Sequence, residues 1–473
     1  MPLFHPGGFV RPDSAHNRQF FALVNVYTDR AGYVAGRSGE KWTMAEAEAF
    51  ERGKQPERPK LLEVMGPGLI TGASDDDPSG IATYSQAGAQ FGYGLGWTLL
   101  LTYPLMAAIQ QISADIGRVT GAGLAGNLRT HYPRWLLYGI VALLLVANII
   151  NLGADLGAMG AALQLLVGGP ILIYVLLFGV ISALLEVFVR YSRYVSVLKW
   201  LCLSLFAYVA TVFVVDVPWL EVGRQLILPS ITLNAAYITA VVAVFGTTIS
   251  PYLFFWQAQE EVEDEKELLG ARPLTVAPEQ APTELQRIRI DTYIGMAFSN
   301  IIALFIVLTT AATLNAHGIT DIQTSSQAAE ALRPIAGRFA FTIFAAGIIG
   351  TGFLALPVLA GSAAYAVGEA AGWRVGLANK PWRAKAFYGV IAAATAIGVL
   401  LNFTPIDPIK ALFWSAVING VVAVPVMVMM MLLAARSEVM GRFAIGPTLR
   451  VIGWLATGVM AAAAIGMFAT WGS

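Results

Sequence analysis

Charged residues are scarce in this chain of 473 residues: they make up 13% of it, about half the share typical of soluble domains. Cysteine occurs once, at Cys202, which excludes a disulfide scaffold and a cysteine-ligated metal centre. Lysine and arginine together number 30, equal to the 30 acidic residues, so the chain lacks the basic excess of a nucleic-acid-binding protein. Because hydrophobic residues make up 56%, the composition indicates a polytopic membrane protein.

Long apolar runs account for most of the chain after residue 60. A run of about 20 apolar residues can cross a bilayer as a helix. Eleven such runs are predicted, within about 61–92, 95–117, 134–163, 170–190, 194–216, 234–262, 288–315, 335–368, 386–404, 408–435 and 447–471. The sequence therefore predicts an all-α integral membrane fold.

Residues 1–60 are polar and carry nine Lys or Arg, with no apolar stretch of the kind that marks a secretory signal. We expect a cytoplasmic N-terminal extension followed by a transmembrane core over 61–471. If the N-terminus is cytoplasmic, all but four basic residues fall in segments on the inner side, the four exceptions being Arg224, Arg333, Arg338 and Lys410. The positive-inside rule then predicts a cytoplasmic N-terminus and an extracytoplasmic C-terminus. We expect the protein in the plasma membrane.

The first and sixth apolar segments are interrupted by proline at their middles. Pro78 and Gly80 interrupt the first, and Pro251 interrupts the sixth within GTTISPY, residues 246–252. Proline removes a backbone donor and clashes with the preceding turn, so both helices should split there. Paired interruptions in two halves are typical of inverted-repeat transporters, with half-helix ends that suit a cation. The repeats are predicted at about 61–216 and 234–435, with an extra helix at about 447–471.

Three consecutive acids, Asp75, Asp76 and Asp77, lie in the first interruption. A buried carboxylate in a membrane needs a cation or water, and three adjacent ones cannot all be buried and charged. We expect Asp77, which directly precedes the proline, to bind the ion. Asp75 and Asp76 are expected in a water-filled vestibule, where Asp76 lines the site.

Several motifs resemble the NRAMP family of divalent-metal transporters. The resemblance begins in residues 66–92, which contain GPG and DPSG, and continues through Ile109–Gly121 (IQQISADIGRVTG), His131–Trp135 (HYPRW) and the GTTISPY segment. It covers the whole predicted core, roughly residues 61–471. It implies a LeuT-type fold of eleven helices, in which a metal ion lies between the broken first and sixth helices.

The sequence departs from the family pattern at the site itself, since the family carries Asp-Pro-Gly-Asn in the first helix and Met-Pro-His in the sixth. Asp77 keeps the aspartate, but Gly80 stands in place of the asparagine. Ser250 replaces the methionine and Tyr252 the histidine, while Thr247 is implied to supply a backbone carbonyl. The resemblance thus implies Asp77, Gly80, Thr247 and Ser250 as the metal site, with Tyr252 lining it.

Replacing a thioether with a hydroxyl leaves a site of oxygen donors, and oxygen donors suit hard cations. Mg²⁺ keeps several waters when bound, and the loss of two larger side chains, at Gly80 and Ser250, leaves room for them. This pattern resembles the NRAMP-related magnesium transporter branch. Asn419, in the tenth predicted helix, is a further residue that could reach the ion or its water shell.

Proton coupling has little support in the sequence, because no histidine lies in a predicted span. The resemblance implies that Asp155 matches a proton-relay acid of the family, with Asn148 and Asn151 on nearly the same helical face. Gln257 stands where a second family histidine is linked to proton movement. Asp155 and Gln257 are therefore interpreted as remnants of a relay. The acidic run at 260–267 is interpreted as a solvated helix end, with attraction of cations to the inner mouth as the alternative.

We therefore expect a transporter that moves a hydrated hard divalent ion, Mg²⁺ and also Mn²⁺, into the cytoplasm by alternating access without proton coupling. Its expected partners are that ion and the lipid bilayer, with no nucleic acid and no resident cofactor. Two alternatives stay open. One is a proton-coupled Mn²⁺/Fe²⁺ symporter of the same family. The other is a Mg²⁺-dependent membrane prenyltransferase, against which the lack of Lys or Arg between Lys60 and Arg118 argues.

Overall fold

The computed structural model describes residues 71–72, 74–188, 203–268, 270–379 and 381–471, together with three short strands nearer the N-terminus. The chain divides into two compact units, one of residues 1–59 with 268–271 and one of residues 60–267 with 272–473. In the first unit, β1 (Tyr27–Thr28), β2 (Tyr33–Ala35) and β3 (Lys41–Thr43) form an antiparallel sheet in that order.

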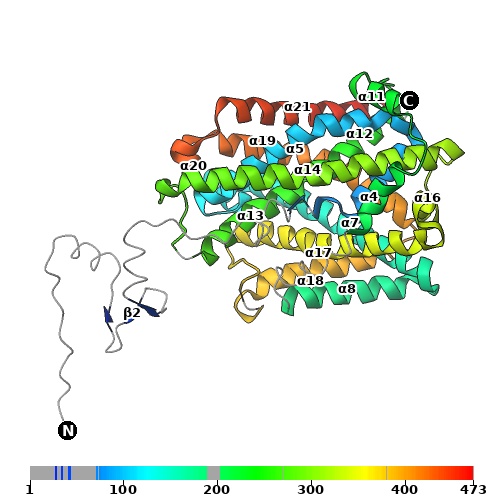
Figure 1. Cartoon of the computed structure of the whole chain (residues 1–473). Coiled ribbons are helices and arrows are strands. Elements are labelled where there is room, and N and C mark those ends of the chain that lie inside the picture. Colours follow the sequence, from blue (N-terminus) through cyan, green and yellow to red (C-terminus); the bar gives the residue numbers. More distant parts are fainter. Residues whose placement is uncertain are drawn as a thin grey trace, which may run out of the picture. The chain divides into compact units, whose positions relative to one another are not determined.

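The described part of the second unit is all-helical, and Figure 1 shows its long helices lying beside one another. Its α-helices are α4 (Pro78–Phe91), α5 (Gly96–Thr120), α6 (Leu124–His131), α7 (Arg134–Val167), α8 (Ile171–Phe188), α10 (Phe206–Val212), α11 (Trp219–Ile227), α12 (Ala235–Thr248), α13 (Pro251–Glu267), α14 (Ala281–Thr313), α15 (Ser325–Glu330), α16 (Arg333–Ala336), α17 (Ala340–Ala371), α18 (Lys385–Leu401), α19 (Pro408–Ala434), α20 (Ser437–Met440) and α21 (Pro447–Ala469).

Both predicted helix breaks are present. In the first, helical residues end at Asp75, Asp76 forms a bend, and Asp77 is extended at φ −70° and ψ 170°. Pro78 then opens α4, at a position where a helix needs no backbone donor. Asp77 caps the new helix, because its Oδ1 accepts a hydrogen bond of 2.6 Å from the Gly80 N–H. The proline and the aspartate together fix where α4 begins.

The second break separates α12 from α13 at Ile249 and Ser250. Thr248 donates its hydroxyl hydrogen to the Val244 carbonyl at 2.9 Å, and Ser250 donates to the Gly246 carbonyl at 2.8 Å. Ser250 thereby satisfies a carbonyl in the last turn of α12, where carbonyls lack a partner in a following turn, whereas the Val244 carbonyl lies one turn earlier in the helix. The hydroxyl residues beside Pro251 thus stabilise the interruption.

Two helix pairs pack backbone against backbone through glycine. A Cβ on Gly246 of α12 would collide with the Ala416 carbonyl and the Gly420 backbone of α19. A Cβ on Gly88 of α4 would collide with the Val307 carbonyl of α14. Small residues allow such close approach between membrane helices. The glycines therefore set the spacing of the helices around the two breaks.

Seven helical segments of the described residues are long and apolar enough to cross a membrane, judged by length and composition alone. They are Arg134–Val167, Ile171–Phe188, Ala235–Glu267, Pro278–His317, Arg333–Ala371, Pro408–Ala434 and Pro447–Ala469. The count of eleven stays a prediction. Four predicted segments are not among the seven. The first is shortened by its break, the second lies in α5, which has 25 residues but is not among the apolar seven, the fifth falls partly on residues 189–202, outside the described residues, and α18 has only 17 residues.

Candidate metal site

Asp77 lies at the centre of the candidate site and is 2% exposed. Besides its cap to Gly80, its Oδ2 accepts hydrogen bonds from the Asn151 side chain of α7 at 3.0 Å and from the Tyr252 hydroxyl of α13 at 3.3 Å. All three donors are neutral. The carboxylate is thus oriented by two helices and by its own helix start, without an ion pair among the described residues.

Gly80 and Thr247 bring the two breaks together on another side of the site. A Cβ on Gly80 would lie 3.2 Å from the Thr247 hydroxyl and 3.3 Å from the Asp75 carbonyl, so the glycine allows α12 to approach closely. Thr247 is buried, and its carbonyl accepts a hydrogen bond of 3.0 Å from Ser250. The sequence predicts that Gly80, Thr247 and Ser250 share one site, and the structure places them around the two helix breaks.

Asp155 of α7 is buried near Asp77 and the Ser79 backbone N–H, at the start of α4. Neither of its carboxylate oxygens has a hydrogen-bond partner of ordinary geometry in the described residues. Asn148, on nearly the same helical face, donates to the Leu359 carbonyl of α17 at 2.9 Å. Asn151 is the member of this helix that contacts Asp77 directly.

In the described part of the chain, Gln257 and Asn419 are not among the hydrogen-bond partners of Asp77. Gln257 of α13 accepts a hydrogen bond of 2.5 Å from Thr71, which precedes the first break. Asn419 of α19 is 2% exposed, and within the described residues its Oδ1 has no hydrogen-bond partner. It follows Ser415 by one turn on α19, and Ser415 contacts Ser79 at the start of α4. Asn419 therefore lies on a helix that reaches the first break.

Asp75 and Asp76 are buried, at 0% and 2% exposed, so the expectation of a water-filled vestibule around them is wrong for this conformation. The Ser299 hydroxyl of α14 lies 2.7 Å from Oδ2 of Asp75 and 3.1 Å from Oδ1 of Asp76. One hydroxyl hydrogen cannot serve both carboxylates at once. The two acids share a partner on α14, whereas Asp77 faces α7 and α13.

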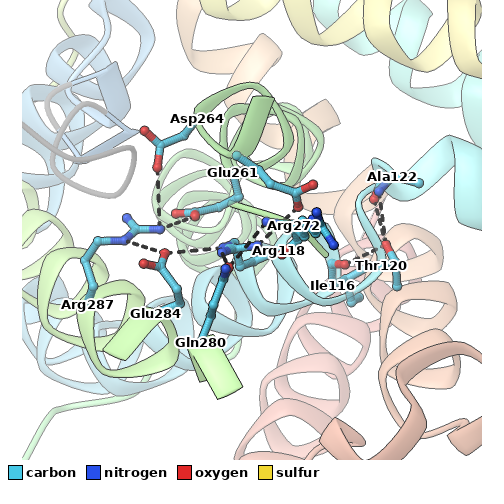
Figure 2. Close-up of polar contacts among 11 residues, drawn as sticks. Ile116, Arg118, Thr120, Ala122, Glu261, Asp264, Arg272, Gln280, Glu284 and Arg287 are labelled. Atoms are coloured by element: carbon cyan, nitrogen blue, oxygen red, sulfur yellow. Dashed lines mark hydrogen bonds and ion pairs between the residues drawn. The ribbon is translucent and has the colours of Figure 1, made fainter. Parts of the chain in front are cut away.

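The acidic run of α13 is not the solvated helix end expected from sequence. Glu261 is fully buried and pairs with Arg287 of α14. Figure 2 shows this pair beside Arg118 of α5, which is also fully buried. Arg118 forms ion pairs with Glu265 at 3.2 Å and Glu284 at 3.3 Å. The interpretation failed because the basic partners lie on other helices, far away in sequence.

Three serines that form hydrogen bonds at the first break, Ser79, Ser299 and Ser415, were not predicted from the sequence. Ser79 donates to the Leu412 carbonyl at 2.8 Å and lies 3.0 Å from the Ser415 hydroxyl oxygen. Ser79 belongs to the DPSG motif, but single serines in apolar helices are common and carry no local signal. Their roles depend on which helix lies opposite, which only the fold shows.

The site contains four buried carboxylates and, within the described residues, no basic partner for them. Asp75, Asp76, Asp77 and Asp155 are all at most 2% exposed, and within the described residues none forms an ion pair with Lys or Arg. Uncompensated charge is costly inside a membrane protein, so such a group calls for a cation or protons. The polar groups around Asp77 are oxygens and amides, which suit a hard cation.

Comparison with known proteins identifies relatives that are named as divalent metal cation transporters. The chain is 26% identical over 466 residues to the divalent metal cation transporter MntH of Burkholderia ambifaria, covering 95% of this chain and 97% of the relative. It is 28% identical over 318 residues to MntH of Yersinia pestis, covering 65% and 73%.

Solved structures agree on the fold. A manganese transporter of Eremococcus coleocola aligns with a TM-score of 0.67 at 16% identity, covering 88% of this chain and 89% of that chain. MhsT, solved with L-phenylalanine, aligns with a TM-score of 0.53 at 12% identity, covering 89% and 99%. The family model described as natural resistance-associated macrophage protein-like matches residues 68–470. The chain belongs to the Nramp family.

Proposed function

We propose that this protein carries divalent metal cations across the plasma membrane into the cytoplasm by alternating access, with Mg²⁺ and Mn²⁺ as its ions. The observation that carries this proposal is Asp77, a buried carboxylate at the junction of two broken helices whose hydrogen-bond donors, within the described residues, are all neutral. A divalent cation bound there would compensate its charge. Helix breaks at membrane depth are typical of ion sites in transporters.

Membership of the Nramp family excludes the alternative function of a membrane prenyltransferase. The relatives are named as divalent metal cation transporters, and the chain is not an enzyme. Because the Eremococcus coleocola structure is of a manganese transporter, the comparison supports Mn²⁺ as a transported ion.

The extension to Mg²⁺ rests on the donors of this chain. Neither break contains methionine or cysteine, and the groups nearest Asp77 present oxygen or amide atoms. Gly80 has no side chain, and a Cβ added at this position would lie 3.2 Å from the Thr247 hydroxyl. We propose that the ion keeps part of its water shell and contacts Asp77, the Thr247 carbonyl and the Ser250 hydroxyl, with Tyr252, Asp76 and Asn419 acting through water.

Transport without proton coupling is the form that we propose. Gln257 cannot titrate and hydrogen-bonds to Thr71, so it holds the first half-helix to α13. One observation favours the alternative of proton-coupled Mn²⁺/Fe²⁺ symport: Asp155 is a second buried acid close to Asp77. The two mechanisms differ in whether ion uptake acidifies the receiving compartment.

The test is ion flux into vesicles reconstituted with the protein, using Mg²⁺, Mn²⁺ and Ca²⁺ in turn while the internal pH is recorded. Uptake of Mg²⁺ and Mn²⁺ without internal acidification is the expected result. Mn²⁺ uptake with stoichiometric acidification and no Mg²⁺ uptake would overturn the proposal in favour of the symporter. Asp155→Asn serves as a control, because it should change acidification only if protons are coupled.

A further inference from the structure

A cavity of about 350 Å³ lies between the second half of α5 and the first turns of α14. The two helices pack against each other side by side (Figure 1). The cavity is lined by Gln111 of α5 and by Leu285, Gln286 and Arg289 of α14. Gln286 and Arg289 are exposed, whereas Gln111 is 7% exposed. The cavity therefore opens at the protein surface and reaches a buried amide, and its size falls within the range of about 300–1,000 Å³ typical of ligand sites.

A lipid-facing stripe of α14 begins at this cavity. Exposed apolar side chains recur there every three or four residues, so they share one face of the helix: Ile290, Ile294, Phe298 and Ile301. Gln286, which lines the cavity, precedes Ile290 by one turn on the same face. A change from polar to apolar side chains along a membrane helix marks the boundary between lipid headgroups and acyl chains. The cavity therefore lies at headgroup depth.

Two opposite charges lie at the cavity without partners of their own. Arg289 forms no ion pair within the described residues. Asp115, one turn after Gln111 on α5, is 8% exposed and likewise forms no ion pair in this part of the chain. Both charges lie close to Tyr293 of α14. The site thus offers a guanidinium at its mouth and a carboxylate behind its inner wall.

Buried oxygen atoms at the inner wall lack hydrogen-bond donors. Gln111 Nε2 lies 3.5 Å from Oδ2 of Asp115, but Gln111 Oε1 and Asp115 Oδ1 have no partner among the described residues. Glu261 and Arg287 also lie close to Asp115, but they pair with each other. Leaving buried acceptors unpaired is unfavourable, so these oxygens call for a ligand that carries N–H or O–H donors.

We propose that this cavity binds the headgroup of an aminophospholipid, with the phosphate on Arg289 and the ammonium group directed at Gln111 and Asp115. Phosphoethanolamine carries an anion and a cation with N–H donors in one short headgroup, which matches the charges and the unpaired oxygens. Phosphatidylglycerol has no cation for Asp115, and phosphatidylcholine has no N–H donors. The acyl chains would lie along the stripe that begins at Ile290.

The predicted topology places the start of α14 on the cytoplasmic side, so the lipid belongs to the inner leaflet. Pockets between membrane helices on that side are known to hold phospholipid headgroups. The inference goes beyond the proposed function, and it does not depend on which ion the protein carries.

The test is lipid retention by the purified full chain, measured by native mass spectrometry. Phosphatidylethanolamine, phosphatidylglycerol and phosphatidylcholine with identical acyl chains are supplied in equal amounts. Phosphatidylethanolamine should be retained about fivefold more than either competitor, the factor expected for roughly one additional hydrogen bond. Equal retention of all three lipids would show a non-specific lipid shell and overturn the proposal. Preferred retention of phosphatidylglycerol would overturn it in favour of an anionic lipid.

Two variants separate the two ends of the headgroup. Arg289→Gln should lower the retention of phosphatidylethanolamine about fivefold, since it removes a charged hydrogen-bond donor to the phosphate. Arg383→Gln is the matched control, because Arg383 is also exposed, lies on the same predicted side and does not line the cavity. Asp115→Asn keeps the shape of the side chain and should remove the preference over phosphatidylglycerol. Identical lipid retention by Arg289→Gln and Arg383→Gln would overturn the site.

A second measurement does not depend on the buried variant. A ligand stabilises only the state that it binds, so phosphatidylethanolamine should raise the melting temperature of the unmodified protein and of Arg383→Gln. It should not raise the melting temperature of Arg289→Gln. A rise of equal size in all three proteins would contradict the role of Arg289. Neither measurement requires transport, so a failure of the proposed function would leave both results unchanged.

Discussion

The Tyr252 hydroxyl donates a hydrogen bond of 3.3 Å to Oδ2 of Asp77. Tyr252 lies in the first turn of α13, after the second helix break, so this bond joins that turn to the last residue of the first break. Tyr252→Phe removes this donor and an oxygen near the proposed ion site, while Asn151 and Gly80 still hold the carboxylate. A hydrogen bond of this kind is worth about 1 kcal/mol, so the KM for Mn²⁺ should rise about fivefold with an unchanged maximal rate. An unchanged KM in vesicle uptake would show that Tyr252 does not act at the site.

The three neighbouring acids should differ in their importance. Asp77→Asn removes the charge but keeps the helix cap, because asparagine caps helices about as well as aspartate. We expect uptake to fall at least 100-fold, without loss of folded protein. Asp75→Asn should lower uptake only a few-fold, since Asp75 faces Ser299 on α14. Equal losses in both variants would contradict the assignment of Asp77 as the ligand.

Ion selectivity should follow the donor set. Gly80→Asn with Ser250→Met introduces an amide and a soft thioether, and a thioether favours later transition metals over hard ions. The ratio of Mn²⁺ to Mg²⁺ uptake should rise about tenfold. Gly80→Ala is the control, because a Cβ there meets the Thr247 hydroxyl at 3.2 Å and tests the cost of bulk alone. A ratio that stays constant would contradict the role of ligand softness.

Arg118 should be essential for stability. It is fully buried and pairs with Glu265 and Glu284, so Arg118→Met breaks both ion pairs, and Glu284 keeps only its longer pair with Arg287 at 3.5 Å among the ion pairs of the described residues. Breaking a buried pair from one side costs about 3–5 kcal/mol, which should lower the melting temperature by several degrees in detergent. Arg338→Met, at an exposed site, should leave it unchanged. Equal melting temperatures for the two variants would show that the network contributes little.

Local sequence was sufficient to predict the helix breaks. Pro78 and Pro251 act on their own turns, so their effect can be read without knowing what lies opposite. The position of Asp77 beside a proline likewise predicted a residue at the centre of the site, and the structure places it between α7 and α13. Its role as an ion ligand stays a prediction.

Contacts between distant helices could not be predicted in the same way. Ser299 is separated from Asp75 by 224 residues, and its hydroxyl has no distinguishing pattern along α14. Glu261 looked like part of a solvated run because its partner Arg287 lies on another helix. In both cases the burial of an acid depends on the packing of helices, which a single sequence does not show.

The glycine contacts divide the region around the breaks into mechanical parts. α12 and α19 touch backbone to backbone at Gly246 and Gly420, and α4 meets the Val307 carbonyl and the Thr310 hydroxyl of α14 at Gly88, so both pairs are closely packed. Each pair should therefore move as one stiff body. The contact of Ser79 with the Leu412 carbonyl and the Ser415 hydroxyl crosses from one body to the other through hydrogen bonds between neutral groups. Motion of one helix pair relative to the other should therefore occur where the two pairs meet, which is where the candidate ion site lies.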